Sequence, residues 1–579
     1  MKNTIFKNAR LLELESPIGM SNPCDVFIKN GIINRIDADI AVDDDCKVID
    51  AKNNLLMPGL INGHFHSSVN HMKGSLPSLP LEIFMLYESP ELECLRPTPR
   101  EAYLRTMLGC MEMLKCGTTS VQDDCFFVPE PDEAIIDAVV QAYIDSGMRV
   151  RLALDQPELD ELKKFPFLNE ILPNDIRAKL SKPPNTSAKK LLEFYKYLIN
   201  KWHGCADGRI KAAVSCSAPQ RVSGDYFLGL NDLSESYDLP LYAHMLETRL
   251  QRVFGETCLN GKSLVQYAND LGVMSERLNI IHAIWVDDTD LDIISEKGVC
   301  IAHNPNSNLR LGSGVMPLRK ILDKNIPVCL GVDEAIADDA VNMWSVMKTT
   351  GSIHNLTDWN YSNWPSAKEI IISATRNGGR AMREPKLGTL EIGAPADLIL
   401  VNLQSLPFVP LNNLLRQLVY CELGNSVYLT MVAGKIVSTD QRLSTVNEHE
   451  VLLEASEIFE HKKELIMSKG NIVQVIGTVV DVEFPPDKLP NIYNALETDL
   501  EGDKLVLEVE QLVGNNWARC LALGSTDGLA RGQEVIDTGA PVQVPVGDPS
   551  LGRLFNVKGE AIDDGEQIPP DAERWPIHR

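Results

Sequence analysis

The sequence predicts an α/β protein built on a parallel (β/α)8 TIM barrel, with a small β-sandwich domain and a separate, small C-terminal all-β barrel. Three observations predict this architecture. Eight short apolar stretches alternate with helix-like stretches through the middle of the chain. Strand-like segments flank this region on both sides, and beyond residue 466 the chain changes to short strands of alternating polarity.

Residues 1–57 and 388–445 are predicted to form one composite β-domain. Strand-like segments with a hairpin-type turn at Asn30-Gly31 open the chain, and a similar set follows residue 388. Strands on both sides of a long α/β segment indicate that the two ends fold together.

Residues 58–387 are predicted to form the (β/α)8 barrel. The candidate strands are apolar on both faces, because barrel strands are buried between the interior and an outer layer of helices. They are Leu56–His66, Gly117–Asp123, Val150–Asp155, Ile210–Ser215, Leu239–His244, Leu278–His282, Val299–His303 and Val328–Asp333.

The composition excludes several classes of function. The chain has 579 residues and a net charge of −25, which argues against a nucleic-acid or anionic-membrane partner. No apolar run approaches the roughly 18 residues that a membrane span needs, and the first residues lack the apolar stretch of a signal peptide. Thirteen cysteines with no C-x-x-C spacing are typical of reduced thiols, so we expect a cytoplasmic protein.

Metal-ligand and proton-transfer side chains collect at the ends of the candidate strands. The carboxyl ends of the strands in such a barrel form the active-site face, so side chains from different strands converge there. Six residues at the ends of five strands fit this pattern: His64, His66, His244, His282, His303 and Asp333. Their convergence indicates an active site more strongly than any one of their motifs.

His64 and His66 form an H-x-H pair at the end of the first barrel strand. Residues i and i+2 of a strand point to the same face, so both imidazoles can reach one metal ion. Two histidines on a solvated strand face are the commoner explanation of this spacing. The apolar segment before the pair argues against that explanation here.

The other motifs leave alternatives open. His244 and Glu247 form an H-x-x-E pair whose carboxylate lies past the strand end, which suits proton transfer better than metal binding. A buried histidine beside a loop glutamate explains this pair equally well. His282 could bond a metal-bound water or be an ordinary core histidine. His303 could bind substrate or cap a turn, and Asp333 could cap the following segment.

Residues 1–445 resemble the metal-dependent amidohydrolase superfamily, in the branch of aminohydrolases that act on nucleobase-like and triazine rings. The stretches that carry the resemblance are Pro58–His66, His244–Thr248, His303–Gly314 and Gly388–Asp397. The resemblance implies one divalent metal ion per subunit, usually zinc, with iron as the alternative. The ligands that it implies are His64, His66, His244 and Asp333.

The resemblance also implies how a hydrolytic water is handled. Zinc lowers the pKa of its bound water to about 7 and so supplies hydroxide at neutral pH. Glu247 would protonate a ring nitrogen, Asp333 would take the proton of the water, and His282 would orient the hydroxide or stabilise the adduct. The leaving group would be ammonia or an amine.

The sequence departs from adenosine-type deaminases of this branch where the substrate should bind. Those proteins tend to have a histidine at the position of Ser217 and a glycine at the position of Glu334. The candidate substrate contacts are His303, Ser217, Gln220 and Glu334. Glu334, Asp338 and Asp339 would favour an amine-rich or cationic substrate, unless they form an ordinary solvated acidic loop.

The rest of the chain is predicted to begin with a helix over 446–466. From Met467 onward it resembles the N-terminal region of the ATP synthase catalytic β subunit, which implies a β-barrel over 467–545 and a truncated start of a nucleotide-binding domain over 546–579. The Gly-rich phosphate loop of that family is absent, so we expect no nucleotide binding. The abrupt change at Met467 indicates a fusion of two reading frames.

The sequence therefore predicts a metal-dependent hydrolase of C–N bonds other than peptide bonds, which deaminates a nucleobase-, pterin- or triazine-like heterocycle. One alternative is hydrolysis of another C–N, C–Cl or C–S bond at the same metal site. The other is a scaffold or assembly protein that docks to ATP synthase subunits through the C-terminal barrel. The expected partners are a small heterocyclic substrate, water and further copies of the hydrolase domain, without nucleic acid or membrane insertion.

Overall fold

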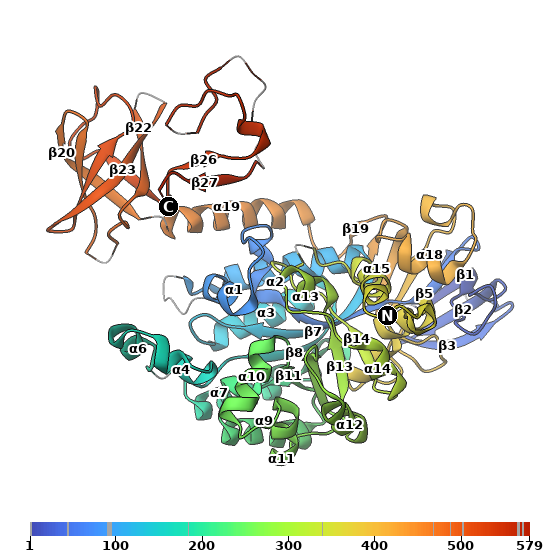
Figure 1. Cartoon of the computed structure of the whole chain (residues 1–579). Coiled ribbons are helices and arrows are strands. Elements are labelled where there is room, and N and C mark those ends of the chain that lie inside the picture. Colours follow the sequence, from blue (N-terminus) through green and yellow to red (C-terminus); the bar gives the residue numbers. More distant parts are fainter. Residues whose placement is uncertain are drawn as a thin grey trace. The chain divides into compact units, whose positions relative to one another are not determined.

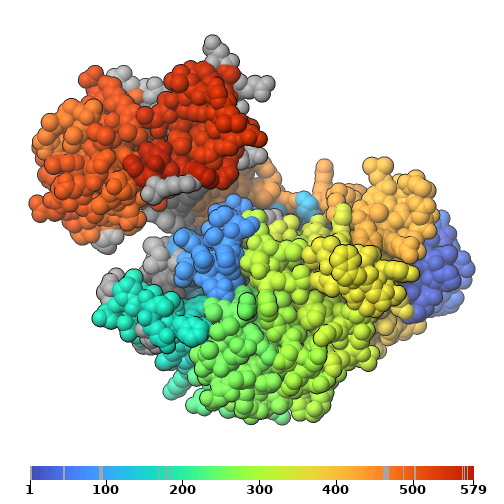
Figure 2. All heavy atoms as spheres, in the orientation of Figure 1, coloured from blue at the N-terminus to red at the C-terminus, as the bar shows by residue number. Residues whose placement is uncertain are grey.

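The computed structural model describes residues 3–42, 46–89, 95–182, 184–338, 340–466, 468–486, 488–500, 503–557, 559–563, 565, 568–569 and 572–578 (Figure 1). The chain divides into two compact units, Met1–Ala455 and Ser456–Arg579. Figure 2 shows the same chain as spheres, with the second unit in orange and red. No helix among the described residues is long and apolar enough to cross a membrane.

The first unit contains the predicted barrel of eight parallel strands. Two of these strands are each interrupted once, by Ala213 in the fourth and by Gly331-Val332 in the eighth. β15 pairs in parallel with β6 and closes the ring. The barrel strands are β6 (Leu60–His66), β7 (Thr118–Phe126), β8 (Arg149–Asp155), β9 (Ile210–Ala212) with β10 (Val214–Ser215), β11 (Leu241–Met245), β12 (Leu278–His282), β13 (Cys300–His303), and β14 (Val328–Leu330) with β15 (Asp333–Glu334).

Gly331 explains the interruption of the eighth strand. A Cβ atom at this position would lie 2.5 Å from Asn304 Oδ1 and 2.9 Å from the backbone nitrogen of His64. Only glycine therefore allows the eighth strand to approach the first so closely, immediately before Asp333.

Helices separate the barrel strands, and local sequence signals define their ends. The helix α2 (Pro99–Lys115) begins with a capping box, in which Thr98 Oγ1 accepts the N–H of Glu101 at 3.2 Å. The other helices of this part of the unit are α1 (Leu81–Glu88), α3 (Glu133–Ser146), α4 (Glu161–Lys164), α5 (Leu168–Ile171), α6 (Asn174–Leu180), α7 (Ala188–Trp202), α8 (Cys205–Gly208), α9 (Gly224–Tyr237), α10 (Arg249–Cys258), α11 (Leu264–Leu271), α12 (Asp288–Glu296), α13 (Pro305–Arg310), α14 (Leu318–Asp323), α15 (Met343–Ile353), α16 (Ala367–Ala374) and α17 (Arg376–Ala381).

The two ends of the first unit meet in a nine-stranded sheet, as the strand pattern predicts (Figure 1). Its path is β19-β18-β17-β16-β5-β1-β2-β3, and β4 pairs with β1. The two halves, joined through β1, enclose one apolar core. The strands are β1 (Asn3–Leu11), β2 (Cys24–Lys29), β3 (Ile32–Asp37), β4 (Cys46–Asp50), β5 (Leu55–Pro58), β16 (Leu398–Val401), β17 (Val427–Val432), β18 (Lys435–Thr439) and β19 (Arg442–Leu443), and the helix α18 (Leu414–Tyr420) lies between β16 and β17 in the chain.

The stretch Leu56–His66, expected to be one strand, is two strands that belong to different sheets. β5 pairs with β16 in the terminal sheet, whereas β6 enters the barrel. The break falls at Gly59, where a Cβ atom would lie 2.2 Å from the side chain of Thr119. The apolar pattern continues through the break because both strands are buried.

Asp397 connects the terminal sheet to the barrel. Its carboxylate accepts hydrogen bonds from Arg149 Nε at 2.7 Å and Nη2 at 3.0 Å, from the backbone N–H of Ala433 at 2.7 Å and from Ser120 Oγ at 3.3 Å. Asp397 is buried, so these partners replace water completely. This network explains the role of Asp397 at the end of the Gly388–Asp397 stretch, because it holds two parts of the unit together.

Replacing Asp397 with alanine is expected to lower the free energy of unfolding of the first unit by about 3–5 kcal/mol. The reason is that the buried guanidinium of Arg149 would lose the carboxylate that accepts two of its hydrogen bonds and would be left with the longer ion pair to Glu384 at 3.6 Å. Denaturant-induced unfolding would measure the change. As a control, Glu15→Ala removes an exposed ion pair with Lys368 and should cost less than about 1 kcal/mol. Equal losses in the two variants would contradict the role of Asp397.

The second unit contains a closed six-stranded antiparallel barrel, in the order β20-β21-β24-β23-β22-β25. α19 (Glu448–Ile466) precedes it and spans the division between the units, while Met467 lies outside the described residues. The barrel strands are β20 (Lys469–Ile476), β21 (Val479–Glu483), β22 (Asn494–Leu500), β23 (Asp503–Gly514), β24 (Trp517–Ala522) and β25 (Glu534–Pro541); β26 (Gln543–Pro545) pairs with β27 (Arg574–Pro576). Alternate side chains of the barrel strands fill its interior.

Candidate active site

Four of the predicted residues converge at the carboxyl end of the barrel. His64 and His66 come from β6, His244 from β11 and Asp333 from β15, and one potential ligand atom of each lies within 4.8 Å of the others. His64 Nε2 is 3.1 Å from His244 Nε2 and 3.2 Å from Asp333 Oδ1. His66 Nε2 is 3.4 Å from the same carboxylate oxygen. All four side chains are buried, so this is a compact set of three nitrogens and one oxygen.

Backbone hydrogen bonds orient two of the imidazoles. The Nδ1–H of His244 donates to the carbonyl oxygen of Ser217 at 2.7 Å, and that of His66 donates to the carbonyl oxygen of Asp124. These bonds leave Nε2 of each ring directed into the cluster, which is how metal-binding histidines are normally held. Asp124, Asp155 and His244 form a second group whose potential ligand atoms lie within 4.8 Å of one another; the Nδ1 of His244 is engaged by Ser217.

Burial sets the charge of the cluster. It lowers the pKa of His64 to about 4 and that of His244 well below the usual range, so both imidazoles are neutral. Burial alone would raise the pKa of Asp333, but hydrogen bonds from His64 and His66 hold it well below its usual range. For His66, burial opposes protonation, but its hydrogen bond with Asp333 prevails and raises its pKa to about 10. A divalent ion that binds here would displace this proton.

The cluster fits the metal ion that the sequence leads us to expect. Imidazole nitrogen and carboxylate oxygen are the ligands that zinc prefers beside thiolate, and three histidines with one aspartate match its usual coordination number. The oriented Nε2 atoms and the ionised Asp333 supply lone pairs to an ion once the proton on His66 is displaced. The prediction of a divalent-metal site is confirmed, in that the donor set fits such an ion.

Glu247 and His282 lie beside the cluster. His282 Nε2 is 3.5 Å from Glu247 Oε2 and 3.7 Å from Asp333 Oδ2. On its other side, the Nδ1–H of His282 donates to Asn308 Oδ1 at 2.8 Å. Glu247 follows the end of β11, and burial raises its pKa, so it is a carboxyl group suited to carrying a proton.

Backbone strain is concentrated at these strand ends. His282 has a φ of 74° and Asp333 a φ of 71°, and Ser217 and Leu246 are also left-handed. Such conformations are costly for residues other than glycine and persist where the surrounding structure imposes them. Here they turn the chain at the ends of the barrel strands, where the candidate catalytic groups lie.

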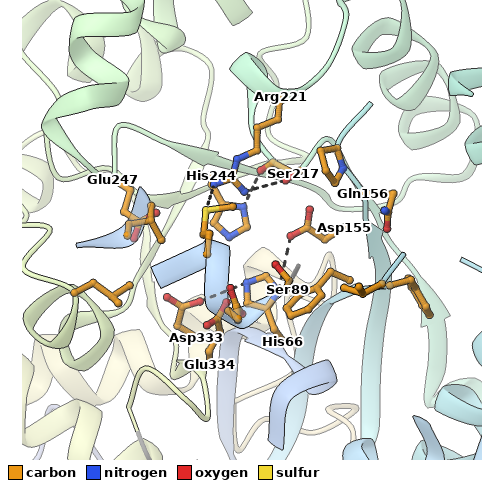
Figure 3. A pocket seen from close by; sticks show the side chains of 18 of the residues that line it. His66, Ser89, Asp155, Gln156, Ser217, Arg221, His244, Glu247, Asp333 and Glu334 are labelled. Atoms are coloured by element: carbon orange, nitrogen blue, oxygen red, sulfur yellow. Dashed lines mark hydrogen bonds and ion pairs between the residues drawn. The ribbon is translucent and has the colours of Figure 1, made fainter. Parts of the chain in front are cut away.

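A pocket opens above the cluster (Figure 3). Ser217 and Glu334 line it, as expected for substrate contacts, and so does Arg221. Gln220 lines a neighbouring pocket instead. His303 is buried, with its Nε2 3.0 Å from His354 Nε2, and is not among the residues that line the described pocket.

Several lining residues were not anticipated. Asp155 is the last residue of a barrel strand. Selecting ligand-type residues at the carboxyl ends of the strands, which identified Asp333, could have identified Asp155 as well. Glu88, Gln156 and Arg221 lie on a helix and on connections, where no periodicity or motif singles them out.

The fold and the cluster define a metal-dependent hydrolase of the TIM-barrel class. Residues 55–437 match the Amidohydrolase family, and the chain belongs to this family. It is therefore a hydrolase that acts on carbon–nitrogen bonds, as predicted. Residues 472–539 match the β-barrel domain of the ATP synthase alpha/beta family, which confirms the second resemblance.

Curated relatives support the same assignment. A 5'-deoxyadenosine deaminase of Methanosarcina mazei is 29% identical over 460 residues, which cover 79% of this chain and 98% of the relative. A 5-methylthioadenosine/S-adenosylhomocysteine deaminase of Dictyoglomus turgidum is 29% identical over 434 residues, with 75% and 93% covered.

Solved structures share the fold. An adenosine deaminase from Xanthomonas campestris with bound zinc has a TM-score of 0.68 at 23% identity, covering 79% of this chain and 98% of its own. Atrazine chlorohydrolase from Arthrobacter aurescens, complexed with zinc, has a TM-score of 0.69 at 22% identity, covering 79% and 99%.

Proposed function

We propose that this protein is a zinc-dependent deaminase of an aminated heterocycle, with adenine nucleosides and aminotriazines as the first compounds to test. The convergence of His64, His66, His244 and Asp333 beside Glu247 and His282 carries the proposal. The two relatives named as deaminases of adenine nucleosides support it, since both align over most of their length.

The four clustered side chains would hold the metal ion. A bound zinc ion would lower the pKa of a coordinated water and make hydroxide available near neutral pH. The chain's own groups manage the protons. Asp333, ionised and facing His282, would accept the proton of the attacking water, and His282 Nε2 would accept a hydrogen bond that fixes the position of this water.

Glu247 would supply the proton that the ring requires. Its buried carboxyl group has a raised pKa and can protonate the ring nitrogen next to the carbon under attack. The ring then carries the new C–O bond, and the C–N bond to the amino group breaks as ammonia leaves with the proton that Asp333 took from water. The remaining hydroxyl proton would return to Glu247, which leaves a carbonyl group on the ring and restores the acid.

Ammonia release from a panel of aminated purines, pterins, pyrimidines and triazines tests this function. We expect at least one scaffold to release ammonia in an amount equal to the hydroxylated product, with one zinc ion per chain. Release of chloride or a thiol without ammonia would instead support the alternative reaction at the same site. A metal-free preparation with no hydrolytic activity would favour a scaffold protein.

We also propose that the first unit associates with copies of itself. Large apolar side chains stand exposed on it between α15 and α16, where Trp359 is 100%, Leu356 79% and Tyr361 76% exposed. Large apolar side chains exposed this close together in the chain are found at interaction sites. Sedimentation of the purified protein should show a dimer or larger assembly, and a monomer at all concentrations would contradict this.

The C-terminal barrel is proposed to take no part in catalysis, because every candidate catalytic residue belongs to the first unit. A chain that ends at residue 466 should keep its kcat/KM within about twofold of the full-length value. Steady-state ammonia release measures this directly. Loss of activity at unchanged zinc content would show that the barrel contributes, and capture of ATP synthase subunits by the full chain alone would give it a separate role in assembly.

A further inference from the structure

Three buried acceptor atoms line the active-site pocket without a hydrogen-bond donor among the described residues. They are Glu88 Oε1, Asp155 Oδ1 and Gln156 Oε1. The residues are 8%, 5% and 7% exposed, so bulk water does not reach them freely. Because buried polar atoms are almost always paired, these acceptors indicate that the donors come from a molecule bound in the pocket.

Glu88 and Glu334 place two carboxyl groups in contact. Glu88 is the last residue of α1 and Glu334 follows Asp333 on β15; both line the pocket, and burial together with the neighbouring Glu88 carboxyl group raises the pKa of Glu334 well above its usual range. The carboxyl end of a helix is itself negative and disfavours an acidic residue. A purely structural role does not require two carboxyl groups side by side at the negative end of a helix. A positively charged ligand, in contrast, would be stabilised by both carboxyl groups and by the helix end.

The basic group on the opposite wall is already engaged. Arg221 is the only lysine or arginine among the described residues that line this pocket. It donates to Ser217 Oγ at 3.3 Å and lies 2.9 Å from Met85 Sδ. In Figure 3, Arg221 lies near Ser217 and His244, whereas Glu334 projects beside Asp333. Arg221 and His66 attract the Glu88 carboxyl group electrostatically, but Arg221 donates its hydrogen bond to Ser217 instead.

The structure also separates the acidic residues that follow the eighth strand. Glu334 lines the pocket, but Asp338 is not among the lining residues and accepts a hydrogen bond from Asn306 Nδ2 at 2.9 Å. Asp339 lies outside the described residues. Of the acidic residues that could recognise a cation, Glu334 is thus joined by Glu88 and Asp155, from two distant segments of the chain.

We propose that Glu88, Glu334 and Asp155 select an aminated heterocycle that carries a second, positively charged substituent, an ammonium or guanidinium group. This inference rests on the proposed deaminase function. The cation would donate to the carboxyl groups of Glu88 and Glu334, while Asp155 and Gln156 would accept from the N–H groups of the same molecule. An anionic substituent would be repelled by the same carboxylates in a pocket where water screens poorly.

Matched substrates test the proposal on the zinc-loaded, full-length protein. One series is 5'-amino-5'-deoxyadenosine, 5'-deoxyadenosine and adenosine-5'-carboxylate, which share the nucleoside and carry a positive, a neutral and a negative 5' substituent. The other is melamine with one aminoethyl, propyl or carboxymethyl substituent. On the scaffold that is deaminated, we expect kcat/KM of the cationic member to exceed that of the neutral one by about tenfold or more.

Isosteric variants assign this preference to residues. Glu88→Gln and Glu334→Gln should each bring the ratio of cationic to neutral kcat/KM close to one, at unchanged zinc content. The control Glu133→Gln, at an exposed position on α3, should leave the ratio as it is. Calorimetric binding of the cationic members to zinc-loaded Glu247→Gln should weaken by about tenfold when Glu334→Gln is added.

The two hypotheses fail in different ways. A preference for the neutral or anionic member, in rate or in binding, overturns the inference, and so does a ratio that neither Glu88→Gln nor Glu334→Gln changes. If no compound of either series releases ammonia but the cationic members still bind through Glu334, the recognition stands and the proposed reaction is wrong.

Discussion

Replacement of His64 by alanine is expected to remove both the zinc ion and the hydrolase activity. His64 Nε2 lies between His244 Nε2 and Asp333 Oδ1, at 3.1 and 3.2 Å, so its loss opens the centre of the cluster. We expect less than about one tenth of the zinc content and a fall in kcat/KM of more than about a thousandfold. Metal analysis of the purified protein and ammonia release measure the two effects.

The matched control is another histidine of the same unit. His449 is exposed on α19, and His449→Ala should keep one zinc ion per chain and full activity. If His64→Ala still bound stoichiometric zinc and turned over substrate, the ion would have to be held elsewhere and the proposed ligand set would be wrong.

Glu247→Gln is expected to lower kcat by about a hundredfold to ten-thousandfold while zinc content stays at one per chain. Glutamine keeps the shape of the side chain but cannot pass a proton to the ring. Steady-state kinetics and metal analysis separate this effect from loss of the ion. The exposed Glu256→Gln serves as the control and should behave as the unmodified protein.

The pH profile distinguishes proton donation from a merely structural role of Glu247. Burial raises the pKa of Glu247, and the protonated form is the one that can act as an acid. The rate of the unmodified protein should therefore fall as the pH rises through this raised pKa. In Glu247→Gln that descending limb should be absent. A variant that kept both kcat and the limb would show that another group supplies the proton.

The barrel and the metal cluster could be predicted because both follow from local patterns. Buried parallel strands are apolar on both faces, and their carboxyl ends meet at one edge of the barrel. A ligand-type residue at a strand end, such as His66 or Asp333, is therefore positioned by the strand itself. The same reasoning could not separate β5 from β6, because strands of two different sheets look alike when both are buried.

By itself, the sequence predicted the class of reaction and the residues that would hold the metal ion: strand position brings the candidate side chains together, and the resemblance to amidohydrolases selects four of them as ligands. Only the tertiary structure decided what faces the rest of the substrate. Glu88 on α1 and Arg221 on a connection reach the pocket because those segments fold back over the end of the barrel. The contact of Glu88 with Glu334 likewise joins two distant segments. A local sequence pattern does not predict contacts between distant segments, because such contacts depend on long-range packing rather than on the periodicity of any one element.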